Sequence, residues 1–336
     1  MQPRFETPPK ITISITNSCN LRCRYCYADC TAAPSSRELA TQQWLDFIDY
    51  LVANGFIQVY FEGGEPLHRS DFGKILRHCG RRLMTWVRTN GTLVTRDVAN
   101  ELKRLNVGTV LVDILGASGQ THDYLTGRRG SFAKARAAVE YLLDAGIPTF
   151  MLTILNRHNA SELQDYLALA KTLGVPKVGI LRLYPLGRAK MRWRELALSL
   201  DEQMRVIKAL RPPRGLRIMQ SWHPRDHNCC WQGAAVNAYG DSIGCVYLRE
   251  YVNFGNILRT PFLNTWHGNA LYRELRSGRV DASCSDCNAT QGTRGGCRST
   301  AYAFHGKWTA PDPFCANLNN GVDLRELPQR LLQKNV

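Results

Sequence analysis

Short apolar runs alternate with longer amphipathic stretches through the first two thirds of the chain. Six of these runs have the length and the branched aliphatic content of buried strands, and they cover residues 11–15, 57–60, 84–87, 109–114, 149–155 and 178–183. Between them apolar residues return at helical spacing, most clearly in the segment 37–54 with Trp44, Ile48 and Leu51. Further helices are predicted from a cap at Ser70-Asp71 to His78, and over 95–105, 131–145 and 160–173.

This alternation of strand and helix predicts an α/β domain with a parallel sheet and with helices outside it. Six units are too few for a closed barrel of eight strands, so we expect an open, partial barrel. The pattern changes after the segment 211–215, Arg-Pro-Pro-Arg-Gly, which has the composition of a linker. Beyond it helical periodicity fades, and the runs 235–239 and 242–248 flank Gly240-Asp241 as in a β-hairpin. We therefore expect four parts: a tail over 1–10, a barrel over 11–210, a small cysteine-rich domain over 211–320 and a tail over 321–336.

Three cysteines stand close together directly after the first predicted strand, at Cys19, Cys23 and Cys26. Three soft ligands at this spacing suit one iron–sulfur cube, which needs four ligands and would keep one iron open for a small chelating molecule. Tyr25 places an aromatic ring beside the site. The same thiols also suit part of a zinc knuckle, so the spacing alone leaves two kinds of metal site open. Cys30, four residues further on, is either a reserve ligand or a spare thiol.

Polar groups follow the next strands at their ends, where the ligands of parallel sheets gather. The segment 61–66, Phe-Glu-Gly-Gly-Glu-Pro, combines two glycines that let the backbone approach a ligand with a carboxylate that can accept a hydrogen bond from an ammonium group. The segment 88–92, Arg-Thr-Asn-Gly-Thr, ends the third strand. Asp113, Thr153 and Arg182 occupy later strand ends, although Asp113 could serve only to pair with a neighbouring Lys or Arg.

Together and in this order, the three motifs resemble those of the radical SAM enzymes. The resemblance covers residues 10–210 and implies a partial (β/α)6 barrel. It also implies that the open iron binds S-adenosylmethionine, which is cleaved to a 5′-deoxyadenosyl radical that abstracts hydrogen from the substrate. In the family the Gly-Gly-Glu-Pro run holds the methionine amino group, and the asparagine position lies near the ribose. The residues that we expect to bind S-adenosylmethionine are Tyr25, Gly63, Gly64, Glu65, Pro66, Asn90, Asp113, Thr153 and Arg182.

The sequence departs from the family after the fourth strand. Relatives often have His-Asp-x-x-Arg-Gly there, whereas the arginine position of this chain holds Thr126. Arg128 and Arg129 are the candidates to replace that arginine.

A second set of four thiols lies near the C-terminus, at Cys284, Cys287, Cys297 and Cys315. Zinc is one candidate for them, because paired cysteines commonly make zinc ribbons. With Cys230 and Cys245 before them and the run Gly-Gly-Cys-Arg at 295–298, they resemble the SPASM extension of radical SAM proteins, a small cysteine-rich α+β domain that carries auxiliary four-iron clusters. The resemblance implies that these four cysteines hold the outer auxiliary cluster.

The inner auxiliary cluster of that extension is harder to place in this chain. Its candidate ligands are Cys229, Cys230 and Cys245. The family has a further cysteine shortly after the position of Cys297, where this chain has Ala301. The inner site therefore has three ligands and an open iron, is absent, or uses one of the non-cysteine candidates His223, Asp226 and His227. We expect two or three [4Fe–4S] clusters in all.

Composition and charge indicate which partners and which compartment the protein has. The net charge of +15 favours acidic partners, but no block of five or six like charges marks a nucleic-acid patch, and scattered solvated charges remain the alternative. Twelve cysteines in a chain of 336 residues without an apolar signal segment indicate metal binding and a cytoplasmic protein. No apolar run of about 18 residues predicts a membrane span.

These patterns predict a radical SAM/SPASM oxidoreductase that matures a ribosomal peptide or a peptide-derived cofactor. The alternative substrate is a small molecule: a sugar, an aminoglycoside-like alcohol or a tetrapyrrole. A metal-dependent nucleic-acid-binding or scaffold protein is a third alternative, which the Gly63–Pro66 run disfavours. About ten residues precede the first strand, so we expect a separate protein to bind any peptide leader. A flavodoxin- or ferredoxin-type protein is the expected electron donor.

Overall fold

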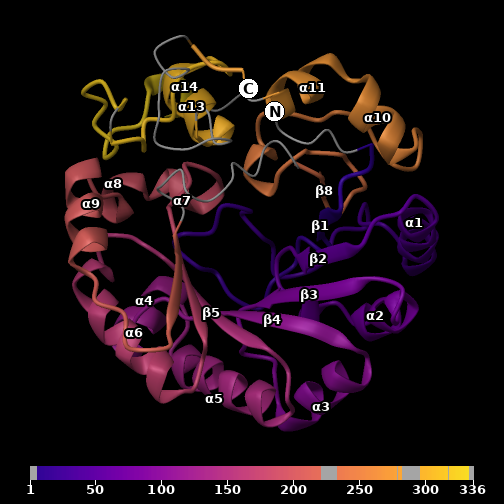
Figure 1. Cartoon of the computed structure of the whole chain (residues 1–336), viewed down its shortest axis with the longest axis horizontal. Helices are drawn as coiled ribbons and strands as arrows, with labels where there is room; N and C mark the ends of the chain where they lie inside the picture. Colours follow the sequence, from indigo (N-terminus) through magenta and orange to yellow (C-terminus); the bar gives the residue numbers. More distant parts are fainter. Residues whose placement is uncertain (1–5, 221–232, 278, 282–295, 317, 333–336) are drawn as a thin grey trace.

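A computed structural model of the chain describes residues 6–220, 233–277, 279–281, 296–316 and 318–332. Eight parallel strands form one sheet in the order β7-β6-β5-β4-β3-β2-β1-β8. The six predicted strands make its centre: β1 (Lys10–Ser14), β2 (Gln58–Glu62), β3 (Met84–Thr89), β4 (Val107–Asp113), β5 (Thr149–Ile154) and β6 (Lys177–Leu181). Each lies beside its neighbour in sequence, which confirms the predicted open α/β arrangement (Figure 1).

Two short strands extend the sheet at both edges; the first was not predicted from the sequence, and the second lies within the predicted hairpin run 235–239. The strand β7 (Arg217–Gln220) follows the predicted linker directly and pairs with β6. The strand β8 (Ala235–Val236) pairs with β1 at the opposite edge. The predicted hairpin around Gly240-Asp241 is wrong in its extent, because β8 takes β1 as its partner and keeps only one antiparallel bridge, between Val236 and Ser242. The predicted second arm, 242–248, begins at the bridge residue Ser242 and ends in a 3-10 turn, η4 (Val246–Leu248).

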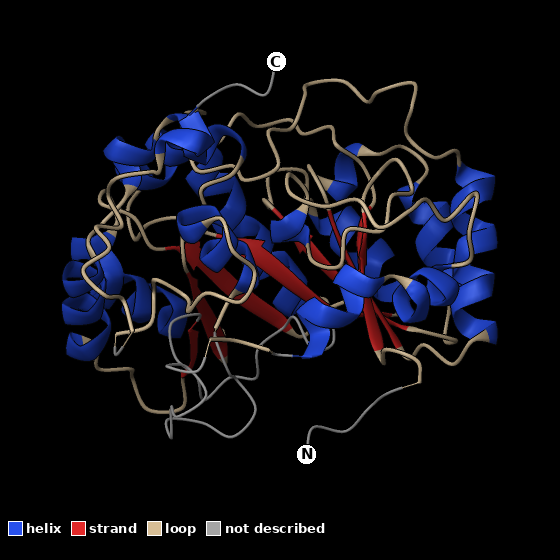
Figure 2. Cartoon of the chain, turned by 90° about the horizontal axis from the view of Figure 1, so that it is seen from above, coloured by secondary structure: helices blue, strands red, loops and turns tan. Residues whose placement is uncertain are grey.

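The predicted helices cover the outer face of the sheet (Figures 1 and 2). They are α1 (Thr41–Ala53), α2 (Phe72–Cys79), α3 (Arg96–Arg104), α5 (Ser131–Asp144) and α6 (Leu163–Thr172), the last preceded by the 3-10 turn η2 (Ala160–Glu162). Their apolar faces form the main core with the strands; Trp44, Ile48 and Leu51 of α1 are completely buried. The predicted cap of α2 is wrong in one respect. Asp71 stands at the N-cap position, but its carboxylate binds Arg69 and Thr41 and makes no cap hydrogen bond.

Further helices connect the strands where no helix was predicted. They are η1 (Pro66–His68), α4 (Gly119–Thr126), α7 (Gly187–Met191), α8 (Trp193–Leu196) and α9 (Leu200–Ala209). Two of them, α4 and α7, lie against the loop that follows β1: Leu125 O accepts from Arg24 N at 2.8 Å, and Ala189 N donates to Cys26 O at 3.2 Å. The carboxyl ends of the strands are therefore covered by short helices that touch the three-cysteine loop.

The described C-terminal residues form a smaller assembly between the two edges of the sheet (Figure 1). Its helices are α10 (Phe262–Gly268), α11 (Ala270–Ser277), α13 (Arg298–His305) and α14 (Gln329–Leu332). Stacked rings support it, with Tyr302 and Trp308 centroids 3.9 Å apart. It is bound to the barrel by Trp193, whose Nε1 donates to Leu324 O at 2.7 Å. Within the described part of the chain, no helix is long and apolar enough to cross a membrane.

Candidate metal centre and cofactor site

The loop after β1 carries Cys19, Cys23 and Cys26 over the carboxyl ends of the strands, all three as free thiols. Burial, Glu65 and Cys26 together raise the pKa of Cys19 to about 12. Burial, Cys26 and Cys19 raise the pKa of Cys23 as well. A nearby cation favours the thiolate forms of Cys19 and Cys23, and the irons of a cluster supply such cations. This donor set fits the predicted cube.

The three-cysteine loop differs from a site for a single metal ion. Among the residues that the structure describes, no three Cys, His, Asp or Glu side chains converge tightly enough to hold one metal ion. A cube has a different requirement, because each thiolate binds its own iron and the ligands stand further apart.

Cys30 lies beside this loop, hydrogen-bonded to Cys26. That hydrogen bond is the largest influence on the pKa of both thiols: it lowers the pKa of Cys26, which Arg188 also lowers, and it raises the pKa of Cys30. Cys30 therefore contacts a predicted ligand, and its role as a reserve ligand or a spare thiol stays open.

Backbone groups of the three-cysteine loop are held by arginines from two later elements. From α7, Arg188 Nε donates to Cys23 O at 3.1 Å and Nη1 donates to Cys30 O at 2.9 Å. After α4, Arg128 Nη1 donates to Asn20 O at 3.2 Å. Arg128, one of the two candidates to replace the missing family arginine, thus reaches the loop, whereas Thr126 bonds Ser131 inside the α4–α5 turn.

The two glycines of the segment 61–66 meet protein backbone. A Cβ atom at Gly63 would lie 2.4 Å from Thr16 O, and one at Gly64 would lie 1.9 Å from Ser18 O. Gly63 also has a φ of +145°, which L side chains rarely adopt. The two glycines therefore let the end of β2 cross closely under the start of the three-cysteine loop, and the approach of this backbone to a ligand stays a prediction.

Glu65 is fully buried, and protein groups already satisfy its carboxylate. It accepts hydrogen bonds from Asn90 N at 2.7 Å, Thr89 Oγ1 at 2.8 Å and Leu67 N at 3.1 Å. Burial raises its pKa to about 7, although these hydrogen bonds act in the opposite direction. Glu65 thus joins the end of β2 to the end of β3, and the following Pro66 begins η1.

Asn90 lies against the three-cysteine loop. Its Nδ2 donates to Asn20 Oδ1 at 2.9 Å and lies 3.8 Å from the sulfur of Cys19, and its Oδ1 accepts from Thr92 N. Tyr25 is buried next to Cys23, with which it shares a hydrogen bond. These two predicted residues and the cysteines therefore belong to one site.

The three remaining predicted residues have protein partners of their own. Asp113 pairs with Arg88 at 3.0 Å, as the alternative for this residue anticipated. Thr153 Oγ1 accepts from Asn159 Nδ2 at 3.2 Å. Arg182 forms a buried ion pair with Asp312 of the C-terminal part at 2.6 Å. Each contact gives a protein-internal reason for a polar residue at a strand end.

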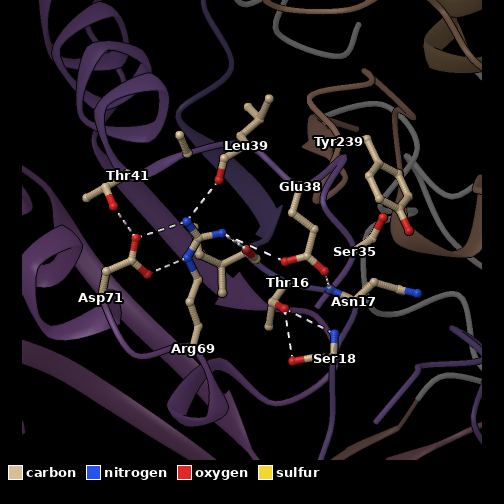
Figure 3. Close-up of polar contacts among 12 residues, drawn as sticks. Thr16, Asn17, Ser18, Ser35, Glu38, Leu39, Thr41, Arg69, Asp71 and Tyr239 are labelled. Atoms are coloured by element: carbon tan, nitrogen blue, oxygen red, sulfur yellow. Dashed lines mark hydrogen bonds and ion pairs between the residues drawn. The ribbon is translucent and has the colours of Figure 1, made fainter. Parts of the chain in front are cut away.

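Arg69, which was not predicted from the sequence, binds backbone groups on both sides of the three-cysteine loop (Figure 3). Arg69 Nη1 donates to Ile15 O at 2.9 Å, Nη2 donates to Leu39 O at 2.9 Å, and Nε lies 2.6 Å from Asp71. Glu38 accepts from Asn17 N at 2.8 Å in the same group of contacts. Arg69 directly follows η1, and its charge beside the Gly-Gly-Glu-Pro run was the only signal available.

A polar group at the strand ends was also missed. Tyr27 donates to Glu62 Oε1 at 2.5 Å, Arg249 Nη2 donates to Ser14 Oγ at 2.8 Å, and the Arg249 guanidinium lies 5.2 Å from the centre of the Tyr27 ring. Tyr247 closes the group with its ring 5.0 Å from that of Tyr27. These residues come from β1, β2, the three-cysteine loop and the C-terminal part, so no local pattern could have joined them.

Two of the four predicted outer auxiliary ligands are described, and one aspartate organises both. Asp312 Oδ2 accepts from Cys297 N at 2.8 Å, and its main-chain oxygen accepts from Cys315 N at 2.9 Å. Cys245 stands at the start of η4, and Ala301 is buried in α13. The other predicted auxiliary residues lie outside the described part: Cys229, Cys230, Cys284, Cys287, His223, Asp226 and His227.

An open parallel barrel with a partly buried three-thiol loop over its strand ends is the arrangement of an enzyme built around a metal cluster. The family model of the radical SAM superfamily matches residues 13–170, and that of the SPASM iron-sulfur cluster-binding domain matches residues 229–288. The mycofactocin maturase MftC of Mycolicibacterium smegmatis is 30% identical over 93% of this chain and 83% of its own length. The AdoMet-dependent heme synthase of Methanosarcina barkeri is 28% identical over 92% of this chain and 97% of its own length.

Two solved structures have the same fold. Streptococcus suis SuiB bound to S-adenosylmethionine has a TM-score of 0.74 at 15% identity, covering 93% of this chain and 78% of its own. The anSMEcpe enzyme with bound AdoMet and Cp18Cys peptide has a TM-score of 0.71 at 16% identity, covering 92% of this chain and 94% of its own. The chain belongs to the radical SAM superfamily and carries a SPASM domain. It is therefore an enzyme that uses S-adenosylmethionine and [4Fe–4S] clusters, as the sequence predicts.

Proposed function

We propose that this enzyme carries out an oxidative modification in the maturation of a ribosomal peptide or a peptide-derived cofactor. The observation that carries this proposal is the similarity to mycofactocin maturase at 30% identity, which extends over both the barrel and the C-terminal part. A second relative named for a peptide, the PqqA peptide cyclase of Streptomyces rochei, is 26% identical over 93% of this chain.

A second candidate substrate is a tetrapyrrole, within the small-molecule alternative. It is favoured by the AdoMet-dependent heme synthase, which is 28% identical and aligns with 97% of its own length. Both candidates need the same radical chemistry, so the substrate is what separates them.

In this proposal Cys19, Cys23 and Cys26 hold the barrel cluster, and S-adenosylmethionine lies beside it. When bound, these two groups supply the 5′-deoxyadenosyl radical that removes a hydrogen atom from the substrate. Tyr25, Asn90 and the 63–66 backbone face the pair, while Glu65 fixes the ends of β2 and β3 around it. Asp113, Thr153 and Arg182 are proposed to shape the strand ends nearby, through their contacts with Arg88, Asn159 and Asp312.

The substrate is proposed to meet the polar group formed by Ser14, Tyr27, Glu62 and Arg249. The guanidinium of Arg249 has a buried Nε without a hydrogen-bond partner in the described residues, so it can bind a carboxylate or carbonyl of the substrate. Beside it Tyr27 donates a hydrogen bond to Glu62, and this pair can accept the proton that oxidation of the substrate releases.

The remaining parts of the proposal concern organisation and partners. The barrel is assigned to residues 11–210 and the auxiliary domain to 211–320, with the outer cluster on Cys284, Cys287, Cys297 and Cys315 and a second one on Cys229, Cys230 and Cys245. A net charge of +15 suits an acidic flavodoxin- or ferredoxin-type electron donor. A separate protein is proposed to present the peptide leader. The thiols of Cys19, Cys23 and Cys26 suit the reducing cytoplasm.

The test incubates the anaerobically reconstituted enzyme with dithionite, S-adenosylmethionine and either short peptides encoded beside its gene or a tetrapyrrole with propionate side chains. We expect a peptide product of lower mass by mass spectrometry, together with 5′-deoxyadenosine. Cys23→Ala should abolish both, because only three thiols hold the barrel cluster. Cys79→Ala is the matched control, since Cys79 is buried in α2 away from the loop.

Turnover of the tetrapyrrole with no change in any peptide would replace the first candidate by the second. Undiminished 5′-deoxyadenosine formation by Cys23→Ala would refute the assignment of the barrel cluster.

A further inference from the structure

The surface around the three-cysteine loop carries an excess of positive charge. It is formed by the loop, by the end of α4 with the turn after it, and by α7 and α8, which together span residues 19–30, 123–130 and 187–196. We call its eight cations the basic face: Arg22, Arg24, Arg128, Arg129, Arg188, Lys190, Arg192 and Arg194. Five carboxylates accompany them, three from the same ranges and two that reach them in ion pairs: Asp29, Asp123, Glu195, Glu250 and Glu326. Eight cations against five carboxylates leave three positive charges.

Contacts between the elements make the basic face one continuous surface. Arg24 Nε donates to Tyr124 O at 2.9 Å, and the guanidinium lies 4.2 Å from the centre of the Tyr124 ring. The Tyr124 hydroxyl donates to Glu195 Oε1 at 2.7 Å. Glu195 is shared by two guanidiniums, those of Arg24 at 3.8 Å and Arg192 at 2.9 Å. The three-cysteine loop, α4 and α8 therefore meet at a carboxylate that neutralises only one of its two cations.

Two cations of the basic face have charges that no carboxylate in the described ranges neutralises. Arg22 is exposed, directly precedes Cys23 and has no ion-pair partner among the described residues. Arg129 has the same properties in the turn after α4. That turn lies against the loop, since a Cβ at Gly127 would lie 3.2 Å from Arg22 O. Solvent-exposed, unpaired guanidiniums beside one another are available to the carboxylates of a partner.

An exposed apolar side chain adjoins these charges. Met191 at the end of α7 is 76% exposed. It lines a groove of about 670 Å³ together with Lys190, Arg192, Arg194 and Leu332, among others. An apolar centre with a charged rim is the composition of a protein–protein interface, and the interfaces of electron-transfer partners are small enough for such a surface.

The basic face lies directly over the thiols assigned to the barrel cluster. Arg188, a member of the face, donates from Nε to Cys23 O at 3.1 Å. The side chains of Cys19 and Cys26 are only partly buried. Electron transfer between proteins falls steeply with distance, so a protein that reduces the cluster has to bind close to this loop. Its own surface must be acidic to complement the excess positive charge.

We propose that the basic face, with the groove beside α7, is the docking surface of an acidic one-electron carrier protein that reduces the barrel cluster. The reduced carrier loses one electron at this surface and the barrel cluster gains it, and no bond forms or breaks in that step. Arg22 and Arg192 contribute to recognition of the carrier. This inference rests on the barrel cluster of the proposed function, and it adds the place where the electron donor binds.

The test uses the full, anaerobically reconstituted chain with two acidic carriers, a flavodoxin and a ferredoxin. Binding of each oxidised carrier is measured by isothermal titration calorimetry at low and at raised ionic strength, without S-adenosylmethionine or substrate. Formation of 5′-deoxyadenosine is then measured with the reduced carrier and, separately, with dithionite, which is a small molecule and needs no docking surface. Iron is determined in every preparation.

Three variants are compared with the wild type. Arg22→Glu reverses the unpaired charge beside the loop. Arg192→Gln removes a charge at the groove, while Arg24 still pairs with Glu195. Arg81→Glu is the matched control, because Arg81 is also exposed and without an ion-pair partner in the described part of the chain, but precedes β3 and so lies at the opposite end of the strands.

We expect the wild type to bind at least one carrier with a Kd that rises with ionic strength. Arg22→Glu should raise that Kd by about tenfold and Arg192→Gln by about threefold, because each loses attraction to an acidic partner. The carrier-driven rate should fall in the same order, while the dithionite-driven rate stays that of the wild type. If Arg22→Glu does not retain iron, Arg192→Gln decides.

A Kd that neither variant changes would overturn the proposal, and so would an equal loss of affinity in Arg81→Glu or a wild type that binds neither carrier. The carrier that drives cleavage identifies the donor as a flavodoxin or a ferredoxin. None of these measurements needs a substrate. A failure to modify any peptide or tetrapyrrole therefore contradicts the proposed function alone, and a failure of carrier binding contradicts this inference alone.

Discussion

At the scale of single residues, Glu65 belongs to a predicted ligand-binding motif, but its carboxylate accepts hydrogen bonds from protein groups. Its carboxylate is buried and holds Thr89 and the backbone of Asn90, so it joins two strand ends under the three-cysteine loop. Burial makes its charged form costly and raises its pKa to about 7 from an ordinary 4.5. Glu65 is therefore a source of pH-dependent stability.

We predict the sign of that dependence. Between pH 4.5 and 7 the folded chain binds a proton at Glu65 that the unfolded chain has released, so this contribution to stability is complete at low pH and is lost as the pH rises. Glu65→Gln removes the titrating group, and it also replaces one of the two acceptor oxygens by an amide nitrogen. The difference in unfolding free energy between wild type and variant should fall by roughly 3 kcal/mol across this range. Anaerobic urea unfolding at several pH values measures it, and a constant difference would contradict the burial argument.

At the scale of elements, the crossing of β2 under the three-cysteine loop depends on two glycines. Gly64 N donates to Thr16 O and Glu65 N donates to Ser18 O, both at 2.8 Å, so backbone lies directly on backbone. This crossing places the start of the cluster loop relative to the sheet. Any side chain at Gly64 must push the two segments apart.

We predict that Gly64→Ala destabilises the protein by about 3 kcal/mol or more and removes the iron of the barrel site, because its Cβ would lie 1.9 Å from Ser18 O. Gly73→Ala in α2 is the matched control. A Cβ there meets no atom within 4 Å, so the control should keep its iron and gain roughly 0.5 kcal/mol from helix propensity. Thermal unfolding and iron analysis measure both variants. Equal iron in the two would show that the crossing does not control the loop.

The residues at this crossing show which features the sequence could predict: local patterns could be predicted, and contacts between distant residues could not. The six central strands, the three-cysteine loop and the segment 61–66 were predicted because spacing and periodicity are local signals. Their physical roles were partly missed, since the atoms that approach Gly64 belong to Ser18, far away in the chain. Arg249 and Asp312 were missed for the same reason: each meets its partner from another part of the chain. The run 235–239 was predicted as a hairpin arm, but the pairing of β8 with β1 was missed because the two strands lie far apart in the chain.

At the scale of the whole molecule, the barrel and the auxiliary site are joined by a buried ion pair. Arg182 follows β6 and was expected at the S-adenosylmethionine site, yet its guanidinium meets Asp312, which in turn holds the backbone of Cys297 and Cys315. The link connects the two sites mechanically, while each keeps its own thiols. The two sites should therefore fail in different ways.

We predict that Cys315→Ala lowers the thermal stability and stops product formation, but still permits S-adenosylmethionine cleavage without a product. The auxiliary cluster contributes folding free energy to the segments around it, and the barrel thiols do not depend on it. Iron analysis, thermal unfolding and quantification of 5′-deoxyadenosine check the three parts. Product at the wild-type rate with the auxiliary iron missing would contradict both roles of that cluster.

The pairing of β8 with β1 has a consequence for the chain during its synthesis. Among the strands of this sheet β1 is synthesised before its two neighbours; β2 follows soon after it, but the other edge of β1 stays unpaired until Ala235 and Val236 are made. Until then Ile11 and Ile13 lie in a strand with one row of unpaired backbone groups, which is a template for association with other chains. Nascent or truncated chains that end before residue 235 should therefore need chaperone protection, whereas the finished chain covers this edge with its own later residues.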